Sequence, residues 1–284
     1  MTWTVLNLIT ETEGYLKKKG ISSARLDAEI LLAKVLNVER LQLYLQFDRP
    51  IQKNELDTYR SLIVRRSQNE PIAYLRGAKE FWSRQFQVGS GVLIPRPETE
   101  LLVEHVLKFF TSSPKKPTSI LDVGCGSGIL AIILACEFPE AQLVAIDISE
   151  EALYYARLNA EAHGVQDQIR FIKTDFFQDM TSWAQNYDLV VSNPPYIPSN
   201  QIQNLMPDVK NFEPALALDG GEDGLNFYKY FVSILPHLTK EHSLVALEVD
   251  GGIGEKVCEM FCSQWKVELV KDYGGQKRVM LAKK

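Results

Sequence analysis

From Ser119 onward the sequence alternates between short apolar runs and longer segments with helical periodicity. The apolar runs have the length of buried strands and lie at residues 120–123, 142–146, 168–173, 187–192 and 243–249. This alternation is typical of parallel strands joined by helical crossovers, so we expect an α/β fold with a mainly parallel sheet. Two last runs, at residues 267–272 and 278–282, predict an antiparallel hairpin that ends the sheet.

Residues 3–76 differ from the rest because their apolar positions follow helical spacing. Gly20 suits the end of a first helix, and Ser22 or Ser23 can cap a second one. A short helical stretch is expected at residues 41–46, and another helix from Asn54 to about Arg66. Residues 81–94 then contain short β-like runs at 81–83, 86–88 and 92–94, with Gly89-Ser90-Gly91 before the last one, which predicts a hairpin-like linker. The expected regions are therefore a helical domain, a β-hairpin linker and an α/β domain, over residues 1–76, 77–95 and 96–284.

Composition limits the classes of partner. The formal net charge of −5 over 284 residues argues against a general affinity for nucleic acid, which usually needs a basic surface. The N-terminus lacks the basic and then apolar pattern of a signal peptide, and no apolar run approaches the roughly 18 residues of a membrane span. We expect a soluble, cytoplasmic protein with no membrane partner.

Cysteine and histidine spacing predicts neither disulfides nor a metal site. The four histidines are scattered, and no C-x-x-C pair occurs among the cysteines, which are Cys125, Cys136, Cys258 and Cys262. Both observations argue against a zinc site. We expect reduced thiols and no bound metal.

A glycine-rich turn, Gly124-Cys125-Gly126-Ser127-Gly128, follows the first predicted strand. Such a turn lets a ligand approach the backbone at the N-terminus of the next helix. Asp147 ends the second predicted strand, 19 residues after Gly128, where an acid can reach a ribose. Because position 129 is Ile, the dinucleotide pattern G-x-G-x-x-G fails. The pattern G-x-G-x-G preceded by Asp122 is instead the form found in S-adenosylmethionine enzymes.

Polar side chains end four consecutive predicted strands, which strengthens the prediction of a cofactor site. Asp122 can serve the methionine ammonium group, while Cys125 is expected to be a small spacer and not a nucleophile. Asp175 follows the third strand, and its neighbour Phe176 can offer an aromatic face to the adenine ring. The alternative for Phe176 is a loop aromatic that packs on the core. S-adenosylmethionine is the expected cofactor, and S-adenosylhomocysteine the product.

The sequence Asn193-Pro194-Pro195-Tyr196 follows the fourth predicted strand, which the prolines end. An amide or aromatic amine nitrogen is a poor nucleophile because its lone pair is delocalised. Asn193 Oδ1 and the Pro194 carbonyl can each accept one N–H of such a group, and these bonds strengthen as the nitrogen becomes positive. Tyr196 can stack on the planar group. The plain alternative is a strand exit with an Asn turn residue.

The sequence closely resembles the HemK/PrmC family, the protein-(glutamine-N(5)) methyltransferases that modify peptide chain release factors. The Ile94-to-Glu100 block is the part most specific to this family, whereas Asn-Pro-Pro-Tyr is shared with adenine methyltransferases of DNA. The other matching stretches are residues 71–74, 81–82, 92–93, 124–128, Asp147, 193–197, 213–214 and 220–225.

The resemblance implies a seven-stranded, Rossmann-like S-adenosylmethionine-dependent methyltransferase sheet behind a helical bundle and a hairpin linker. It implies that residues 124–128, Asp147, Phe176 and Asn193 bind the cofactor, and that residues 193–196 bind a glutamine amide. The implied substrate is the glutamine of the Gly-Gly-Gln motif in release factors 1 and 2. A helical domain attached to such a core favours substrate recognition over packing alone.

Two departures and two rival functions accompany this resemblance. Phe176 stands where the family often has Trp, and residues 248–253 depart from the family's Glu-x-Gly-x-x-Gln pattern. The first rival is an adenine amino-methyltransferase acting on DNA or RNA, against which the acidic charge counts. The second rival is a cofactor-binding protein without catalysis, against which the intact Asn193 and Gly126 count.

Overall fold

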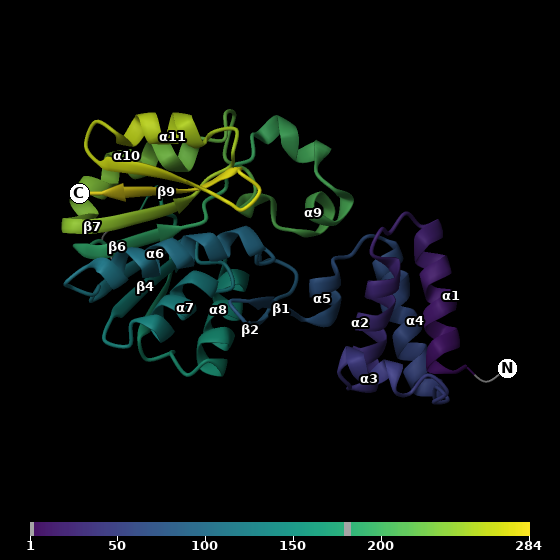
Figure 1. Ribbon diagram of the computed structural model, residues 1–284. Helices are drawn as coiled ribbons and strands as arrows, with labels where there is room; N and C mark the ends of the chain where they lie inside the picture. The colour runs from purple at the N-terminus through teal and green to yellow at the C-terminus, as the bar shows by residue number, and fades with distance from the viewer. Residues whose placement is uncertain (1–2, 179–182) are drawn as a thin grey trace. The chain divides into compact units, whose positions relative to one another are not determined.

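The computed structural model describes residues 3–178 and 183–284 (Figure 1). The chain forms two compact units. One comprises the chain up to Ala78 together with Met206–Phe212, and the other comprises Lys79–Leu205 with Glu213–Lys284. Among the described residues, no helix is long and apolar enough to cross a membrane.

The first unit is helical. Its helices are α1 (Val5–Lys18), α2 (Ala24–Leu36), α3 (Arg40–Tyr44), α4 (Lys53–Ser67), α5 (Ile72–Arg76) and α9 (Pro207–Phe212). Leu16, Leu31 and Tyr59 are among its fully buried side chains. The predicted helices before residue 70 are confirmed, and α5 and α9 add to them. Ser23 does occupy the N-cap position of α2, but its hydroxyl donates to Asp27 and makes no capping bond.

A two-stranded hairpin consists of β1 (Ala78–Phe81) and β2 (Arg84–Gln87), and all of it except Ala78 belongs to the second unit. The predicted β-like runs at 81–83 and 86–88 lie a few residues away from β1 and β2, and the predicted run at 92–94 forms no strand. Trp82 and Ser83 have φ values of 52° and 55° and form the turn itself. A hairpin turn with left-handed backbone at both central positions is of type I′. Because Trp82 and Ser83 occupy these positions, the paired strand residues lie on either side of them and not within the run 81–83.

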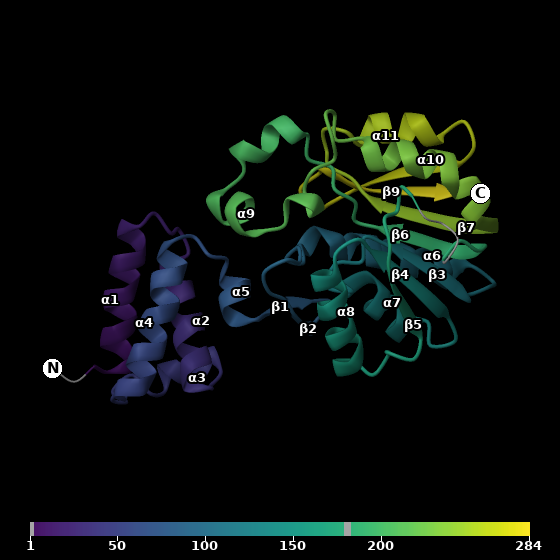
Figure 2. The same cartoon turned by 180° about the vertical axis from the view of Figure 1, so that it is seen from behind.

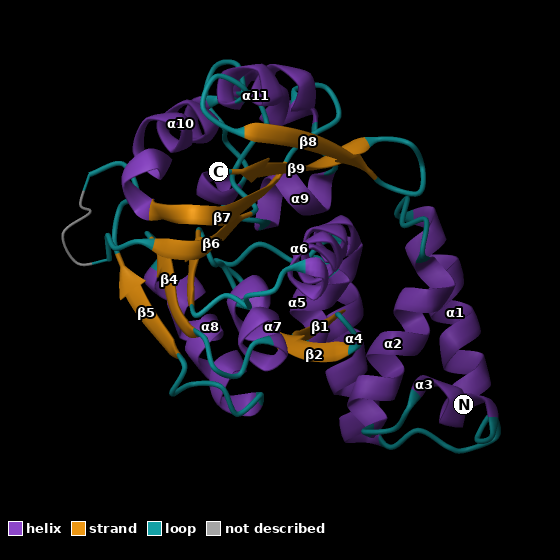
Figure 3. Cartoon of the chain, turned by 60° about the vertical axis from the view of Figure 1, so that its left-hand side comes forward, coloured by secondary structure: helices purple, strands orange, loops and turns teal. Residues whose placement is uncertain are grey.

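The second unit contains a seven-stranded sheet with the order β5-β4-β3-β6-β7-β9-β8 (Figure 3). The strands are β3 (Ser119–Val123), β4 (Gln142–Asp147), β5 (Ile169–Lys173), β6 (Tyr187–Ser192), β7 (Thr239–Glu248), β8 (Lys266–Lys271) and β9 (Lys277–Lys283). Only the pairs that involve β9 are antiparallel. Each predicted strand is found within a few residues of its expected place, and the predicted α/β fold is confirmed.

Helices cover both faces of this sheet (Figures 1 and 2). The short helix η1 (Pro97–Thr99) leads into α6 (Glu100–Ser112), which packs on one face with α7 (Ile129–Glu137) and α8 (Glu150–Ala162). The other face is covered by α10 (Asn226–Leu238) and α11 (Gly254–Phe261). Alternate strand residues enter opposite cores, with Ile120 on the first side and Leu121 on the second. This burial on both sides explains the continuous apolar runs.

The register of the parallel strands aligns their carboxyl ends. Val123 of β3 lies opposite Ile146 of β4 and Ser192 of β6. Ser192 in turn lies opposite Leu247 of β7. The residues that follow these strands therefore emerge at one edge of the sheet, which is where open α/β sheets bind ligands.

The segment between β6 and α10 contains short elements that the sequence did not predict. These include the 3-10 helices η2 (Ser199–Asn204) and η3 (Ala215–Ala217). Ile197 pairs with Asp219 in an isolated parallel bridge, and Ile197 also accepts the Gly220 amide. This contact brings residues 218–221 beside the exit of β6.

Candidate active site

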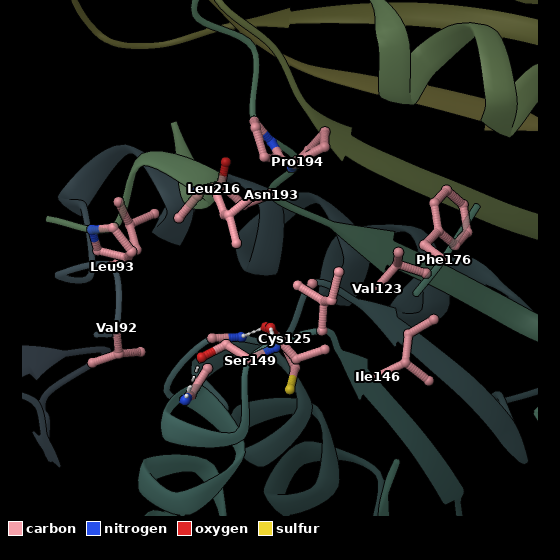
Figure 4. A pocket seen from close by; sticks show the side chains of 18 of the residues that line it. Val92, Leu93, Val123, Cys125, Ile146, Ser149, Phe176, Asn193, Pro194 and Leu216 are labelled. Carbon is pink, nitrogen blue, oxygen red and sulfur yellow. Dashed lines mark hydrogen bonds between the residues drawn. The ribbon is translucent and has the colours of Figure 1, made fainter. Parts of the chain in front are cut away.

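A cavity of about 640 Å³ lies at the carboxyl edge of β3, β4 and β6. Figure 4 shows Asn193, Pro194 and Leu216 across this cavity from Cys125 and Ser149. The sequence-predicted residues that line it are Asp122, Gly124, Cys125, Gly126, Ser127, Asp147, Asp175, Phe176, Asn193, Pro194 and Pro195. The structure thus brings together side chains that are separated by up to 73 positions in the sequence.

The glycine turn is tied to the end of β4. The amides of Gly124 and Cys125 both donate to the Ile146 carbonyl, and the Gly126 amide donates to Asp147 Oδ2 at 2.9 Å. Gly128 closes the turn with φ at 83°, and a Cβ there would lie 3.1 Å from the Cβ of Ala156. The turn therefore needs glycine both for its backbone angle and for the close approach of α8.

Asp147 supports the turn as well as facing the cavity. Its Oδ1 accepts the Ser149 amide at 2.9 Å, while Oδ2 holds Gly126. Burial raises the pKa of Asp147, and the two amide hydrogen bonds oppose this effect. Each carboxylate oxygen keeps a second lone pair, so Asp147 can still accept a hydroxyl from a ribose.

Asp122 carries a buried oxygen without a hydrogen-bond partner in the part of the chain that the structure describes. Its Oδ2 accepts the Ala131 amide at 3.0 Å, but Oδ1 accepts nothing. Burial raises the pKa of Asp122 to about 7. An orphaned carboxylate oxygen on a cavity wall is a site that a ligand cation can satisfy. The methionine ammonium group predicted for this position fits it.

Cys125 and Ser127 form part of the turn and have no reactive environment. Cys125 is 5% exposed, and burial together with the charges of Asp147 and Asp122 raises the pKa of its thiol well above the ordinary value. A protonated, buried thiol is a poor nucleophile. The Ser127 carbonyl accepts a hydrogen bond from Asn159 on α8, which fixes the turn from its other side.

Phe176 belongs to a larger aromatic group beside the cavity. Its ring is parallel to Phe227 within 3°, with centroids 6.1 Å apart, and it contacts Phe231 and Trp183. Because Phe176 is 6% exposed, core packing uses much of its surface. Phe177 and Phe227 also line the cavity and were missed by the sequence analysis.

Asp175 organises the loop that follows β5. Its Oδ1 accepts the Phe177 amide at 2.9 Å. Both residues lie on the cavity wall. The contact is local, and it positions the loop that carries Phe176.

Asn193 is held by two residues that the sequence analysis did not identify as functional. Its Nδ2 donates to Thr99 Oγ1 at 3.2 Å, and Thr99 Oγ1 donates to Glu248 Oε2 at 2.6 Å. Thr99 is completely buried and Glu248 is 2% exposed. Thr99 lies inside the block 94–100 that carries the family resemblance, and this position was the feature of the sequence that could have indicated its role.

Pro194 and Pro195 line the cavity beside Asn193, whereas Tyr196 is not among the described lining residues. Tyr196 packs against the core under α10, and its burial raises the pKa of the phenol well above the ordinary value. A stacking role for Tyr196 on the substrate therefore stays a prediction.

The loop that carries residues 94–96 is fastened by Glu213. Oε2 of this buried carboxylate accepts the Ile94 amide at 3.1 Å, and Oε1 accepts Arg96 at 2.6 Å. Pro95, Arg96 and Leu216 all line the cavity. Leu216 is 70% exposed, which places an apolar side chain where the cavity meets solvent.

Two parts of the chain match known families. Residues 7–77 match the PrmC N-terminal domain, and residues 97–209 match the methyltransferase small domain. A release factor glutamine methyltransferase from Geobacter sulfurreducens is 39% identical over 91% of this chain and 88% of its own length. Another, from Chlorobaculum tepidum, is 39% identical over 95% of this chain and 94% of its own length.

Solved structures share the fold at low sequence identity. The hMettl16 catalytic domain in complex with MAT2A 3′UTR hairpin 6 has a TM-score of 0.55 and is 16% identical. The match covers 83% of this chain and 84% of that chain. At this identity the likeness concerns the methyltransferase fold alone.

Proposed function

The chain belongs to the family of release factor glutamine methyltransferases, and we propose that it methylates the side-chain amide nitrogen of a release factor glutamine with S-adenosylmethionine. One juxtaposition carries this proposal. A single cavity contains the orphaned oxygen of Asp122 and the amide of Asn193, whose Nδ2 is already engaged by Thr99. The first feature suits a cationic methyl donor, and the second suits an N–H donor substrate.

S-adenosylmethionine supplies an electrophilic methyl group when it is bound. The chemistry of the cavity fits its parts, since Asp122 can take the ammonium group and Asp147 the ribose hydroxyls. Phe176 and its aromatic neighbours offer apolar surface to the adenine ring. The residues proposed to hold it are Asp122, Gly124, Cys125, Gly126, Ser127, Gly128, Asp147, Asp175, Phe176 and Asn193.

The glutamine amide would bind to the segment Asn193-Pro194-Pro195-Tyr196. Asn193 Oδ1 and the Pro194 carbonyl accept its two N–H groups and so fix the nitrogen. As the nitrogen becomes positive, these hydrogen bonds strengthen, which lowers the barrier without a general base. The nitrogen loses its proton to solvent after the transfer.

We further propose that the target is the Gly-Gly-Gln glutamine of release factors 1 and 2. The helical region of residues 1–76 would recognise the release factor, with the linker of residues 77–95 joining it to the catalytic domain of residues 96–284. Because release factors act on ribosomes, the proposed place of action is the cytoplasm. No nucleic-acid substrate is proposed.

Mass analysis of a methylation reaction tests the function directly. The protein is incubated with S-adenosylmethionine and either release factor, and the Gly-Gly-Gln peptide is then examined. A gain of about 14 Da on this glutamine is expected, and matched reactions with DNA or RNA should give none. Methyl transfer only to adenine would establish the rival activity, and cofactor binding without any transfer would leave a binding protein.

A further inference from the structure

We propose that Thr99 and Glu248 are positioning residues that fix which atom of the Asn193 amide faces the cavity. The inference rests on the proposed function and adds to it two residues that do not touch the substrate. Three segments meet at this point, because Thr99 ends η1, Asn193 follows β6 and Glu248 ends β7.

The direction of each hydrogen bond follows from the chemistry of the groups. An ionised Glu248 carboxylate can only accept, so the 2.6 Å contact commits the Thr99 hydroxyl hydrogen to Glu248. Only lone pairs of Thr99 Oγ1 then remain for Asn193. The side-chain amide must therefore present Nδ2 to Thr99, which is the arrangement seen at 3.2 Å.

The orientation of the Asn193 amide decides whether a hydrogen-bond acceptor or a donor faces the substrate. With Nδ2 engaged, Oδ1 is the amide atom available on the cavity side. The reversed amide would present N–H groups to the N–H groups of a glutamine, which replaces an attraction by a repulsion. Because the Asn193 side chain alone has little preference between its two orientations, the preference must come from the protein around it.

The surroundings hold the two positioning residues rigidly. Glu248 is adjacent to the exit of β6, since Leu247 pairs with Ser192, and its carbonyl accepts the Tyr228 hydroxyl at 2.7 Å. The Thr99 amide donates to the Arg96 carbonyl within the turn that starts α6. Both side chains are buried, so turning away from this contact would leave their polar groups without partners.

We call the chain of hydrogen bonds from Asn193 through Thr99 to Glu248 the relay, and it depends on the charge of Glu248. A protonated Glu248 can donate to Thr99, which frees the Thr99 hydroxyl hydrogen and removes the preference for one Asn193 orientation. Burial raises the pKa of Glu248, and the Thr99 hydrogen bond lowers it. The other charged or titratable groups that face Glu248 are Arg96, Glu98, Tyr196, Tyr228 and Arg278.

Substitutions of Thr99 test the relay through kcat at saturating S-adenosylmethionine, with a release factor as acceptor. Thr99→Val keeps the shape but loses the hydroxyl, and we expect kcat to fall about tenfold. Thr99→Ser restores a hydroxyl and should recover most of that rate. Thr239→Val is the matched control, because it removes another buried hydroxyl, which donates to the Leu235 carbonyl at 2.7 Å.

Two further measurements separate positioning from folding. Melting temperature and affinity for S-adenosylhomocysteine are measured for each variant. If Thr99→Val fails to fold, Glu248→Gln serves instead, because its side-chain amide carries N–H donors as well as an acceptor and no longer commits the Thr99 hydroxyl hydrogen, so kcat should be lowered at every pH. The wild-type kcat should fall as the pH is lowered through neutrality, and in Glu248→Gln this dependence should disappear.

The outcomes distinguish this inference from the proposed function. Loss in Thr99→Val, recovery in Thr99→Ser and a normal rate in Thr239→Val support the relay. An active wild type with an unchanged Thr99→Val, or with equal losses in both Thr99 variants, overturns the relay alone. A folded wild type that transfers no methyl group to the release factor overturns the proposed function and the relay with it.

Discussion

Asp122 accepts the Ala131 amide through Oδ2 at 3.0 Å and leaves its Oδ1 buried on the cavity wall without a partner among the described residues. A buried oxygen without a hydrogen bond lowers the stability of the folded chain. Burial raises the pKa of Asp122 to about 7, so the protonated and ionised forms are both populated near neutral pH. A ligand cation at Oδ1 would favour the ionised form.

We expect the affinity for S-adenosylhomocysteine to depend on this ionisation. Below pH 7 the ligand must displace a proton from Asp122, so affinity should fall by up to about tenfold per pH unit. Asp122→Asn should weaken binding about 10- to 100-fold at pH 8, because it removes a charge-assisted hydrogen bond, and should abolish the pH dependence. Calorimetric titrations between pH 5.5 and pH 8 would measure both effects.

A ligand without the ammonium group is the control for this prediction. 5′-Methylthioadenosine retains the adenosine part but has no amino acid. Its affinity should be the same at pH 5.5 and pH 8, and the same for wild type and Asp122→Asn. Equal pH dependence for both ligands would show that Asp122 does not bind the ammonium group.

Removing the Asn193 side chain tests the catalytic role of its amide. Asn193→Ala should lower the rate of glutamine methylation by roughly 10²–10³, the scale expected for one oriented polar group in a transition state. Affinity for S-adenosylhomocysteine should change much less, since the glycine turn and Asp147 remain. Single-turnover kinetics of a folded variant would measure the loss, and near-normal turnover would contradict the role.

The sheet and the glycine turn could be predicted because their signals are local. Apolar runs mark strands that are buried on both faces, and a polar residue directly after each run marks the edge of the sheet. Asp122, Asp147 and Asn193 reach one cavity for this reason alone. The parallel register of β3 with β4 and β6 then aligns them.

Other parts of the site depend on contacts that no local pattern encodes. Thr99 and Glu248 are separated by 149 positions, and neither differs in type from an ordinary surface residue. Glu213 holds Ile94 across 119 positions in the same way. The hairpin was predicted a few residues away from its place, because the apolar run 81–83 suggested a strand where Trp82 and Ser83 form the turn.

Glu248 should make stability depend on pH. Its pKa is raised from 4.5 to about 7 in the folded state, so the folded chain holds this proton to a higher pH than the unfolded chain does. Its contribution to stability is thus complete below about pH 4.5 and is lost as the pH rises through 7, at up to about 1.4 kcal/mol per pH unit. Urea unfolding at pH 5 and pH 8 should show a smaller decrease for Glu248→Gln than for the wild type. Equal decreases would contradict this.

We expect Gly224 to be needed for two reasons. Its backbone has a positive φ, and a side chain there would displace Tyr196. A Cβ at Gly224 would meet the Tyr196 carbonyl oxygen, whereas a Cβ at Gly164 would meet nothing within 4 Å. Both glycines have positive φ, 74° and 70°, so Gly164→Ala is a control for backbone strain. We expect Gly164→Ala to cost about 1–2 kcal/mol of unfolding free energy with normal methylation. Gly224→Ala should cost more and lower kcat, because residues 193–196 must move. Equal stability and equal rates in the two variants would show that Tyr196 tolerates the displacement.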